Sequence, residues 1–250
     1  LGLLAYRQGE NDLAQAHYTE GLQIHRQLDN HRGTINALLN LGTVASVKSN
    51  HMLAYRYLEE ALALAREIGS RQQIGAILNN LGTTALQQGD YQAASPYYES
   101  SLRIRREIGE RDGIGAVLGN LAILALRQGN LSEAKTYGEA SLNERRAIGD
   151  KRGIANALSI TATTAYDLND NLTAQRNYEE ILEMQRAIND RWGMATTLDN
   201  LGELAKFAGR YADAEAYFSD GVALYRQLNQ PLGIAEALTL QGELAYEQDD

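Results

Sequence analysis

The 250-residue chain contains no cysteine, which excludes a disulfide framework and thiolate chemistry. It has no apolar run near the roughly 18 residues that a membrane span requires, and no signal-peptide pattern stands at its start. Basic residues number 23 against 32 acidic ones, so the net charge is −9. A nucleic-acid partner would need a concentrated basic face. These absences indicate an acidic protein without a nucleic-acid or membrane partner and favour a cytoplasmic location.

Catalytic and metal-binding patterns are also scarce. The four histidines, His17, His25, His31 and His51, fall in the first quarter of the chain and include no pair at i, i+4, so solvated or partly packed side chains are favoured over a metal site. No nucleophile has a readable base and orienting partner, although a triad assembled across distant segments stays open. We therefore expect no metal, no cofactor and no enzymatic activity.

The stretch DGIGAVLGN, residues 112 to 120, resembles part of a nucleotide-binding loop. A dinucleotide fingerprint needs G-x-G-x-x-G after a buried strand, and here the third glycine comes one residue late. No Walker-type Gly-Lys-Ser/Thr motif occurs. The stretch recurs at a spacing of forty, with the column Gly33, Gln73, Gly113, Gly153, Gly193 and Gly233. A recurring glycine indicates an architectural element, so an internal repeat decides the fold.

Each forty-residue unit carries two stretches of helical periodicity. In the first, a leucine column and two columns of small residues at spacings of 3 and 4 share one face, which lets another helix come close. In the second, an alanine column precedes larger residues by four positions. We expect helices of about 15–18 residues and buried leucines throughout the first column, which consists of Leu38, Leu78, Leu118, Leu158, Leu198 and Leu238.

The turns carry residues that tolerate left-handed backbone, which predicts the helix ends. The first helices should stop at Gly9, Ser49, Gly89, Gly129, Asn169, Gly209 and Asp249, and the second helices at Asp29, Gly69, Gly109, Gly149, Asn189 and Asn229. We predict N-caps at Asn30, Ser70, Asp150 and Asp190, and an N1 proline at Pro231. Pro96, inside a second helix, should delay or distort the turn at 92–95.

The pattern L-x2-L-G-x2-A-x3-G-x4-A-x3-Y, as in LNNLGTTALQQGDYQAASPYYESSL at residues 78 to 102, resembles the tetratricopeptide repeat. The forty-residue form is similar to repeats of spindle-orientation scaffolds, kinesin light chains and bacterial regulator arms. The resemblance implies an all-α, right-handed α-α superhelix of about six repeats in a single domain, 1–250. Its units are 1–29 (partial), 30–69, 70–109, 110–149, 150–189, 190–229 and 230–250 (partial). Truncation at both ends predicts a segment of a larger protein that self-associates through those ends.

In the family that the chain resembles, peptides lie along an inner groove formed by the first helices. The family's groove asparagine corresponds to Asn40, Asn80, Asn120 and Asn200, while Ile160 and Leu240 depart from it. An amide donates and accepts, so these residues suit a peptide backbone; the alternative that they cap or bridge neighbouring helices stays open. The remaining predicted groove residues are Thr43, Asn79, Thr83, Leu86, Gln87, Ile123, Leu126, Arg127, Tyr166, Asp199, Glu203, Lys206, Phe207, Glu243 and Glu247.

The function that this resemblance implies is a non-catalytic module that binds a peptide or an extended protein segment. The acidic C-terminal end of the groove predicts a partner with basic residues. The alternative is an effector-sensing arm of a larger bacterial signal-transduction ATPase or transcriptional regulator. An arginine in the last turn of every second helix is interpreted as offsetting the helix dipole in preference to forming an anion-binding ridge; this column is Arg26, Arg66, Arg106, Arg146, Arg186 and Arg226.

Overall fold

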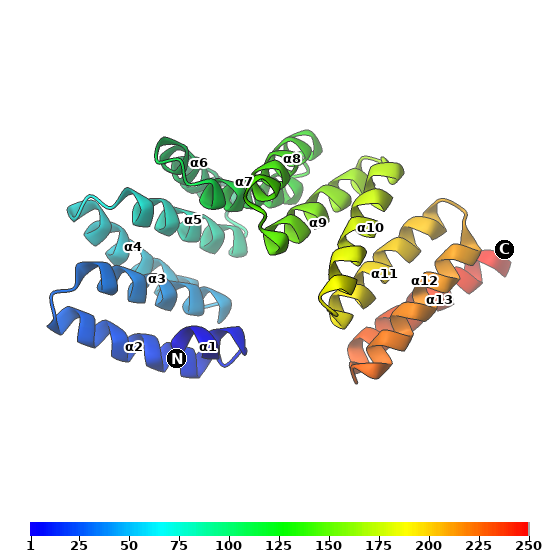
Figure 1. The fold of residues 1–250 in the computed structure, drawn as a ribbon, viewed down its shortest axis with the longest axis horizontal. Coiled ribbons are helices and arrows are strands. Elements are labelled where there is room, and N and C mark those ends of the chain that lie inside the picture. The colour runs from blue at the N-terminus through cyan, green and yellow to red at the C-terminus, as the bar shows by residue number, and fades with distance from the viewer. Residues whose placement is uncertain (250) are drawn as a thin grey trace. The chain divides into compact units, whose positions relative to one another are not determined.

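The computed structural model describes residues 1–249, with side chains through Glu247. Over that range it contains thirteen α-helices and no strand (Figure 1), which confirms the all-α prediction. The helices are α1 (Gly2–Arg7), α2 (Asn11–Gln27), α3 (His31–Val47), α4 (His51–Glu67), α5 (Arg71–Gln87), α6 (Tyr91–Glu107), α7 (Arg111–Arg127), α8 (Leu131–Ile148), α9 (Lys151–Asp167), α10 (Asn171–Ala187), α11 (Arg191–Phe207), α12 (Tyr211–Gln227) and α13 (Pro231–Asp249).

The helices form two compact units, Leu1–Gln128 and Gly129–Asp250. Odd-numbered helices are the first helices of the repeats and even-numbered helices are the second helices. In each unit a first helix packs along the second helix of its own repeat and on the second helix of the repeat before it, as α5 does with α6 and α4. A single domain over the whole chain remains a prediction, since each unit is compact by itself.

Left-handed residues end the helices where the sequence predicts them. Gly89 has φ 78° and Asn169 has φ 58°. After α5, the Gly89 N–H donates to the Leu86 carbonyl at 3.0 Å and the Asp90 N–H donates to the Ala85 carbonyl at 3.0 Å, which is the Schellman arrangement. Asp249 is the exception, because α13 continues through it.

In the repeats that contain Gly42, Gly82 and Gly202, the two helices approach each other at this glycine. A Cβ atom added to Gly82 on α5 would lie 2.7 Å from the ring of Tyr98 on α6, and one added to Gly42 would lie 2.7 Å from Leu58. Tyr98 and Leu58 are fully buried. The glycine therefore provides the space into which the large side chain of the second helix packs, which outweighs its cost of roughly 0.5–1 kcal/mol inside a helix.

The other glycine column has the same purpose between repeats. A Cβ atom on Gly113 would overlap the guanidinium of Arg105, which comes from the preceding second helix, and one on Gly193 would lie 2.6 Å from Gln185. Arg105 is buried and pairs with Glu110 at 2.6 Å. The nucleotide-loop-like stretch around Gly113 is thus a helix-packing element, as the recurrence of the column indicates.

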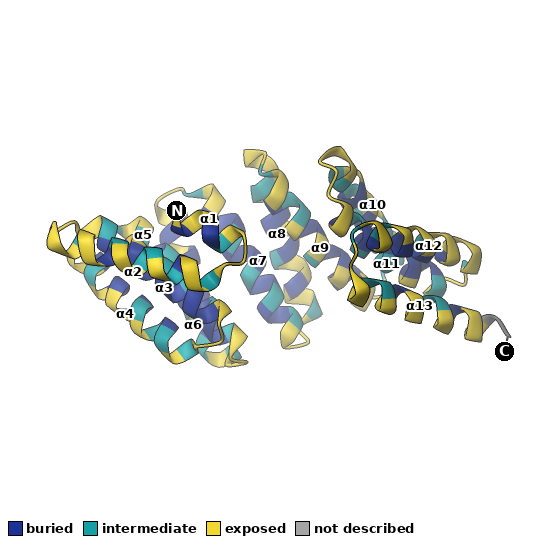
Figure 2. Cartoon of the chain, turned by 90° about the horizontal axis from the view of Figure 1, so that it is seen from below, coloured by how far each residue is buried: buried dark blue, intermediate teal, exposed yellow. Residues whose placement is uncertain are grey.

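The leucine column is buried in five of its six positions, and the dark faces in Figure 2 follow the helix contacts within each unit. Leu38, Leu78, Leu118, Leu158 and Leu198 are all at most 6% exposed. Leu238 on α13 is 43% exposed, so the prediction is wrong at this position. Among the described residues no second helix follows α13 to cover it.

Two other local predictions need correction. Helix α6 begins at Tyr91, at the same column as the other second helices, and runs continuously through Pro96. Proline at the sixth position removes one backbone hydrogen bond only, and Asp90 caps the helix by accepting from the Ala93 N–H at 3.0 Å. The side chain of Ser70 makes no capping hydrogen bond. Asn30, Asp150 and Asp190 cap as predicted, and Pro231 is the first residue of α13.

We predict that Gly82→Ala destabilises the protein by about 1–3 kcal/mol, because the new methyl group overlaps a fully buried ring. Gly242→Ala is the matched control. It occupies the same column in α13, where an added Cβ meets nothing within 4 Å, so it should stabilise by about 0.5–1 kcal/mol through helix propensity. Chemical denaturation followed by circular dichroism measures both. Equal effects at the two positions would mean that Tyr98 moves aside without cost.

Candidate functional site

The structure places all the predicted groove residues on first helices, outside the leucine core. The first unit holds Asn40 on α3, Asn79, Asn80, Thr83 and Gln87 on α5, and Asn120 and Arg127 on α7. The second unit holds Tyr166 on α9, Asn200, Glu203, Lys206 and Phe207 on α11, and Glu243 on α13. All are half-buried or exposed. Helical spacing from the buried leucines sets this position on each helix.

Asparagine amides form a row across the first helices of the first unit. The Asn80 Nδ2 donates to Thr43 Oγ1 at 3.1 Å, from α5 to α3. The Asn120 Nδ2 donates to Asn79 Oδ1 at 2.9 Å, from α7 to α5. We call Asn40, Asn79, Asn80 and Asn120 the amide row. Three of its members, Asn79, Asn80 and Asn120, thus take part in bridges between neighbouring helices, which supports the bridging interpretation for them, while each amide keeps unused hydrogen-bonding capacity.

Thr83 and Gln87 are also tied to their neighbours. The Thr83 hydroxyl donates to the Asn79 carbonyl at 3.1 Å and accepts from the Tyr98 hydroxyl at 3.2 Å. Burial raises the pKa of Tyr98 to about 12, an effect that its hydrogen bond to Thr83 partly offsets. Gln87 accepts a hydrogen bond from Ser46 of α3. The Gln87 contact joins α5 to α3, and the Thr83 contact with Tyr98 joins α5 to α6.

In the second unit the predicted groove residues form two pairs across helices. Lys206 on α11 lies 3.4 Å from Glu243 and 3.7 Å from Glu247, both on α13. Tyr166 and Phe207 meet edge to face, with ring centroids 6.1 Å apart. Lys206 therefore offsets part of the negative charge that the sequence places at this end, and Phe207 presents an exposed aromatic surface.

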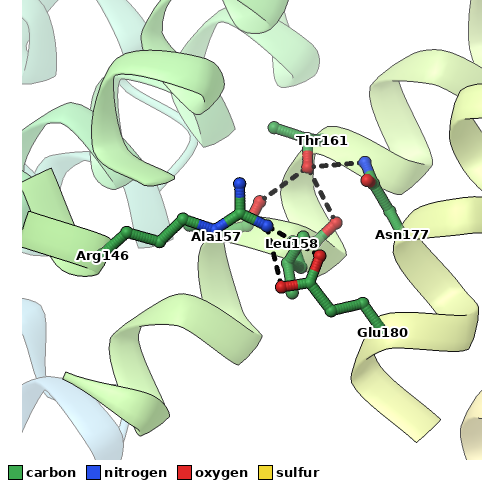
Figure 3. Close-up of polar contacts among 6 residues, drawn as sticks. All are labelled: Arg146, Ala157, Leu158, Thr161, Asn177 and Glu180. Carbon is green, nitrogen blue, oxygen red and sulfur yellow. Dashed lines mark hydrogen bonds and ion pairs between the residues drawn. The ribbon is translucent and has the colours of Figure 1, made fainter. Parts of the chain in front are cut away.

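Two polar contacts join helices of the second unit (Figure 3). Thr161 occupies a column that is leucine in most repeats, and its buried hydroxyl accepts from Asn177 Nδ2 at 3.0 Å while it lies 3.1 Å from the Ala157 carbonyl. Arg146, of the arginine column, pairs with Glu180 of the next second helix at 2.7 Å. Such pairing is consistent with the structural interpretation of the column.

A pocket that sequence reasoning missed lies between α9, α10 and α11. Its volume is about 680 Å³, within the range of small-molecule sites. Tyr178, Ile181 and Met184 supply apolar surface, and Trp192, the only tryptophan in the chain, lines it from the first turn of α11. Asn200 is the one predicted groove residue in its lining. Periodicity could not reveal it, because the pocket depends on which side chains face one another across three helices.

Asp199 on α11 is a half-buried carboxyl group. Burial raises its pKa to about 6, a hydrogen bond from the Tyr225 hydroxyl at 2.9 Å opposes the rise, and Glu203 and Glu236 add to it. Its Oδ1 has no hydrogen-bond partner. In the described part of the chain no group of three metal-ligating side chains occurs, and none of the described helices is long and apolar enough to cross a membrane.

We predict that Asp199→Asn stabilises the protein at pH 7.5 more than at pH 5. The folded-state pKa of about 6 exceeds the unfolded value of about 3.9, so the folded protein gains stability as the pH falls through 6 and the carboxylate takes a proton. Thermal melting of wild type and variant at both pH values measures the difference. Asp220→Asn, at an exposed site on α12, is the control. A variant effect of equal size at the two pH values would show that Asp199 titrates normally.

Comparison with known proteins identifies the repeat. The tetratricopeptide repeat model matches residues 46–107, 113–187 and 161–227, more than half of the chain. No curated protein matches the chain in sequence.

Solved structures share the fold at low sequence identity. BtubC (BKLC) from P. vanneervenii is 19% identical, with a TM-score of 0.79 over 88% of this chain and 92% of that chain. A signal-transduction ATPase with a tetratricopeptide repeat sensor from Pyrococcus horikoshii is 15% identical, with a TM-score of 0.75 over 96% of this chain and 40% of that chain. A Rap protein complexed with Competence and Sporulation Factor is 15% identical, with a TM-score of 0.73 over 98% and 74%. These structures share the fold, and the match of the tetratricopeptide repeat model over more than half of the chain shows that the chain belongs to the tetratricopeptide repeat family.

Proposed function

We propose that the protein is a non-catalytic interaction module that binds a peptide or an extended protein segment across its first helices. The observation that carries this proposal is the amide row of the first unit, which repeats a donor and an acceptor on successive first helices. A peptide backbone offers alternating N–H and C=O groups, which primary amides match without reading side chains. The tetratricopeptide repeat is generally an interaction scaffold, in agreement with this proposal.

The unused hydrogen-bonding capacity of the amide row supports the same function. In the bridge between Asn80 and Thr43 the amide uses one N–H, which leaves its second N–H and its carbonyl oxygen. Asn120 keeps the same groups after its bond to Asn79. Both side chains are half-buried, so a ligand can reach them while the bridge holds them in place. The bridge lowers the entropy lost on binding because the amide is already oriented.

Charge favours a partner segment with basic residues. The chain carries a net charge of −9, and Glu203 is exposed on α11 without an ion pair among the described residues. Exposed charges mainly steer association and are screened by salt. We expect its association with the partner to slow at high ionic strength. The proposal also places this protein in the cytoplasm. The exposed Leu238 and Tyr246 of α13 support self-association through that end.

An effector-sensing arm of a larger regulator is the second candidate. The pocket between α9, α10 and α11 favours it, since a concave apolar site of about 680 Å³ suits a small molecule. The sensor of the P. horikoshii ATPase and the Rap protein with its bound factor have the same fold, which provides an analogy for such a role.

We predict that Asn80→Ala and Asn120→Ala each weaken peptide binding by roughly 0.5–1.5 kcal/mol, the value of one hydrogen bond. Peptides selected from a displayed library on the immobilised chain serve as ligands, and calorimetric titration measures their affinity. The melting temperature should change little, because water can replace the bridging bond at these half-buried positions. Gln92→Ala, exposed on the second helix α6, is the control and should bind as the wild type does.

The opposite result separates the two interpretations of the amide row. If the asparagine variants melt several degrees lower while affinity per folded molecule is unchanged, the row consists of structural bridges. Selection of no peptide by the wild-type chain would likewise count against binding across the first helices.

A further inference from the structure

The pocket of the second unit differs chemically from the amide row and is independent of it. Three helices enclose it. Lys151 from the first turn of α9, Trp192 from the first turn of α11, and Ile188, the residue directly after α10, line it. Trp192 is 59% exposed and Ile188 is 69% exposed. Large apolar side chains that remain this accessible beside a cavity mark a binding site more often than isolated surface residues do.

An internal comparison shows how the pocket arises. In the first unit Arg71, the first residue of α5, pairs with Glu107, the last residue of α6. The equivalent residues in the second unit are Lys151, the first of α9, and Ala187, the last of α10. Ala187 lines the pocket. The replacement of glutamate by alanine both shortens the side chain at this place and leaves Lys151 without its carboxylate.

The charges at the edge favour an anion. Lys151 and Arg152 both line the pocket, and among the described residues neither forms an ion pair. The one acidic residue in the lining is Asp190, whose Oδ1 accepts from the Gly193 N–H at 3.0 Å as the cap of α11. In a chain with a net charge of −9, the lining of this pocket carries one carboxylate but two cations. They complement a negative group on a ligand.

Uncharged polar side chains in the lining add specificity. Asn156, Ser159 and Asn200 line it, and none of them has a hydrogen bond to another described side chain, whereas Thr197 is engaged by Gln185 at 2.9 Å. Small-molecule sites typically combine an apolar wall with a few such groups that fix orientation.

We propose that this pocket binds a small amphipathic anion: an apolar, ring-sized body against Ile181, Met184 and Trp192, and one acidic group beside Lys151 and Arg152. The apolar body buries surface that is now exposed to water, which supplies the affinity. The two cations select the acidic group, and the carboxylate of Asp190, also in the lining, disfavours a second negative charge on the ligand. The site does not depend on peptide binding by the first unit.

The test uses the full chain with two dyes that share a ring system. One is 8-anilinonaphthalene-1-sulfonate, and the other is N-phenyl-1-naphthylamine, its counterpart without the sulfonate. Because Trp192 is the only tryptophan, energy transfer from its emission to the dye reports binding at this pocket. We expect saturable transfer with the sulfonate and weaker binding of the neutral dye.

Paired variants test the charge at the pocket edge separately from the space inside the pocket. Lys151→Glu with Arg152→Glu should weaken the sulfonate dye about tenfold and change the neutral dye less than twofold. His31→Glu with Arg32→Glu, at the equivalent positions of α3, is the control and should change neither dye. Ala155→Phe, which fills the pocket from α9, should abolish energy transfer with both dyes, whereas Ala212→Phe, exposed on α12, should not.

Three results would overturn the proposal. They are energy transfer that survives Ala155→Phe, equal affinity for the two dyes, and equal weakening by the paired reversals at 151/152 and 31/32. Circular dichroism verifies that each variant is folded. If the glutamate pair perturbs the helix, Lys151→Gln with Arg152→Gln removes both charges at the same sites and should weaken the sulfonate dye by a smaller factor.

Discussion

The close approach of the two helices within a repeat is the contact on which the rest of the structure depends. At Gly42 and Gly82 the first helix has no Cβ atom, and the large side chain of the second helix lies against its backbone. Because a methyl group does not fit, each pair is fixed in both distance and register. The helices then have to end at the same level in repeat after repeat, which is why left-handed residues stand at a constant spacing. Side chains outside this contact are free to vary.

Polar side chains also occur at buried positions, where a neighbouring helix supplies a hydrogen-bond partner. Thr161 replaces a leucine without leaving an unsatisfied hydroxyl, because Asn177 donates to it from α10. Ser101 likewise donates to the Gly75 carbonyl at 2.7 Å. On the half-buried face, the amide row uses the same kind of cross-helix bond while keeping spare donors and acceptors. One asparagine can therefore both bridge two helices and bind a ligand. Its removal distinguishes the two roles, because a loss of protein stability reports the bridge and a loss of ligand affinity reports the binding.

Most of the fold could be predicted from the sequence, because helical periodicity and turn chemistry are local properties. The helix ends, five of the six buried leucines and the architectural role of Gly113 followed from the forty-residue columns. Pro96 was misjudged, since a proline one turn into a helix costs one bond that a good cap can offset. Leu238 was misjudged because burial depends on a neighbouring helix and not on the column itself.

The candidate site was less predictable for a related reason. The sequence placed the predicted groove residues on first helices outside the leucine core, but their partners lie about forty residues away, as Thr43 does for Asn80. The raised pKa of Asp199 comes from burial among three helices, which no single column reveals.

The residues that pack the helices and the residues that can bind a ligand stand in different columns of the repeat. This separation explains where binding sites can arise. A column that packs against glycine tolerates few residues. A column at a helix end, such as Arg71 and Lys151, or Glu107 and Ala187, tolerates many, since the ion pair there is exposed and contributes little to stability. Losing one partner of such a pair costs the fold little, yet it frees a cation and opens space at the same point. A repeat protein can therefore acquire a charged pocket by a single substitution without disturbing its helix contacts. The missing partner of Lys151 marks such a position in the second unit.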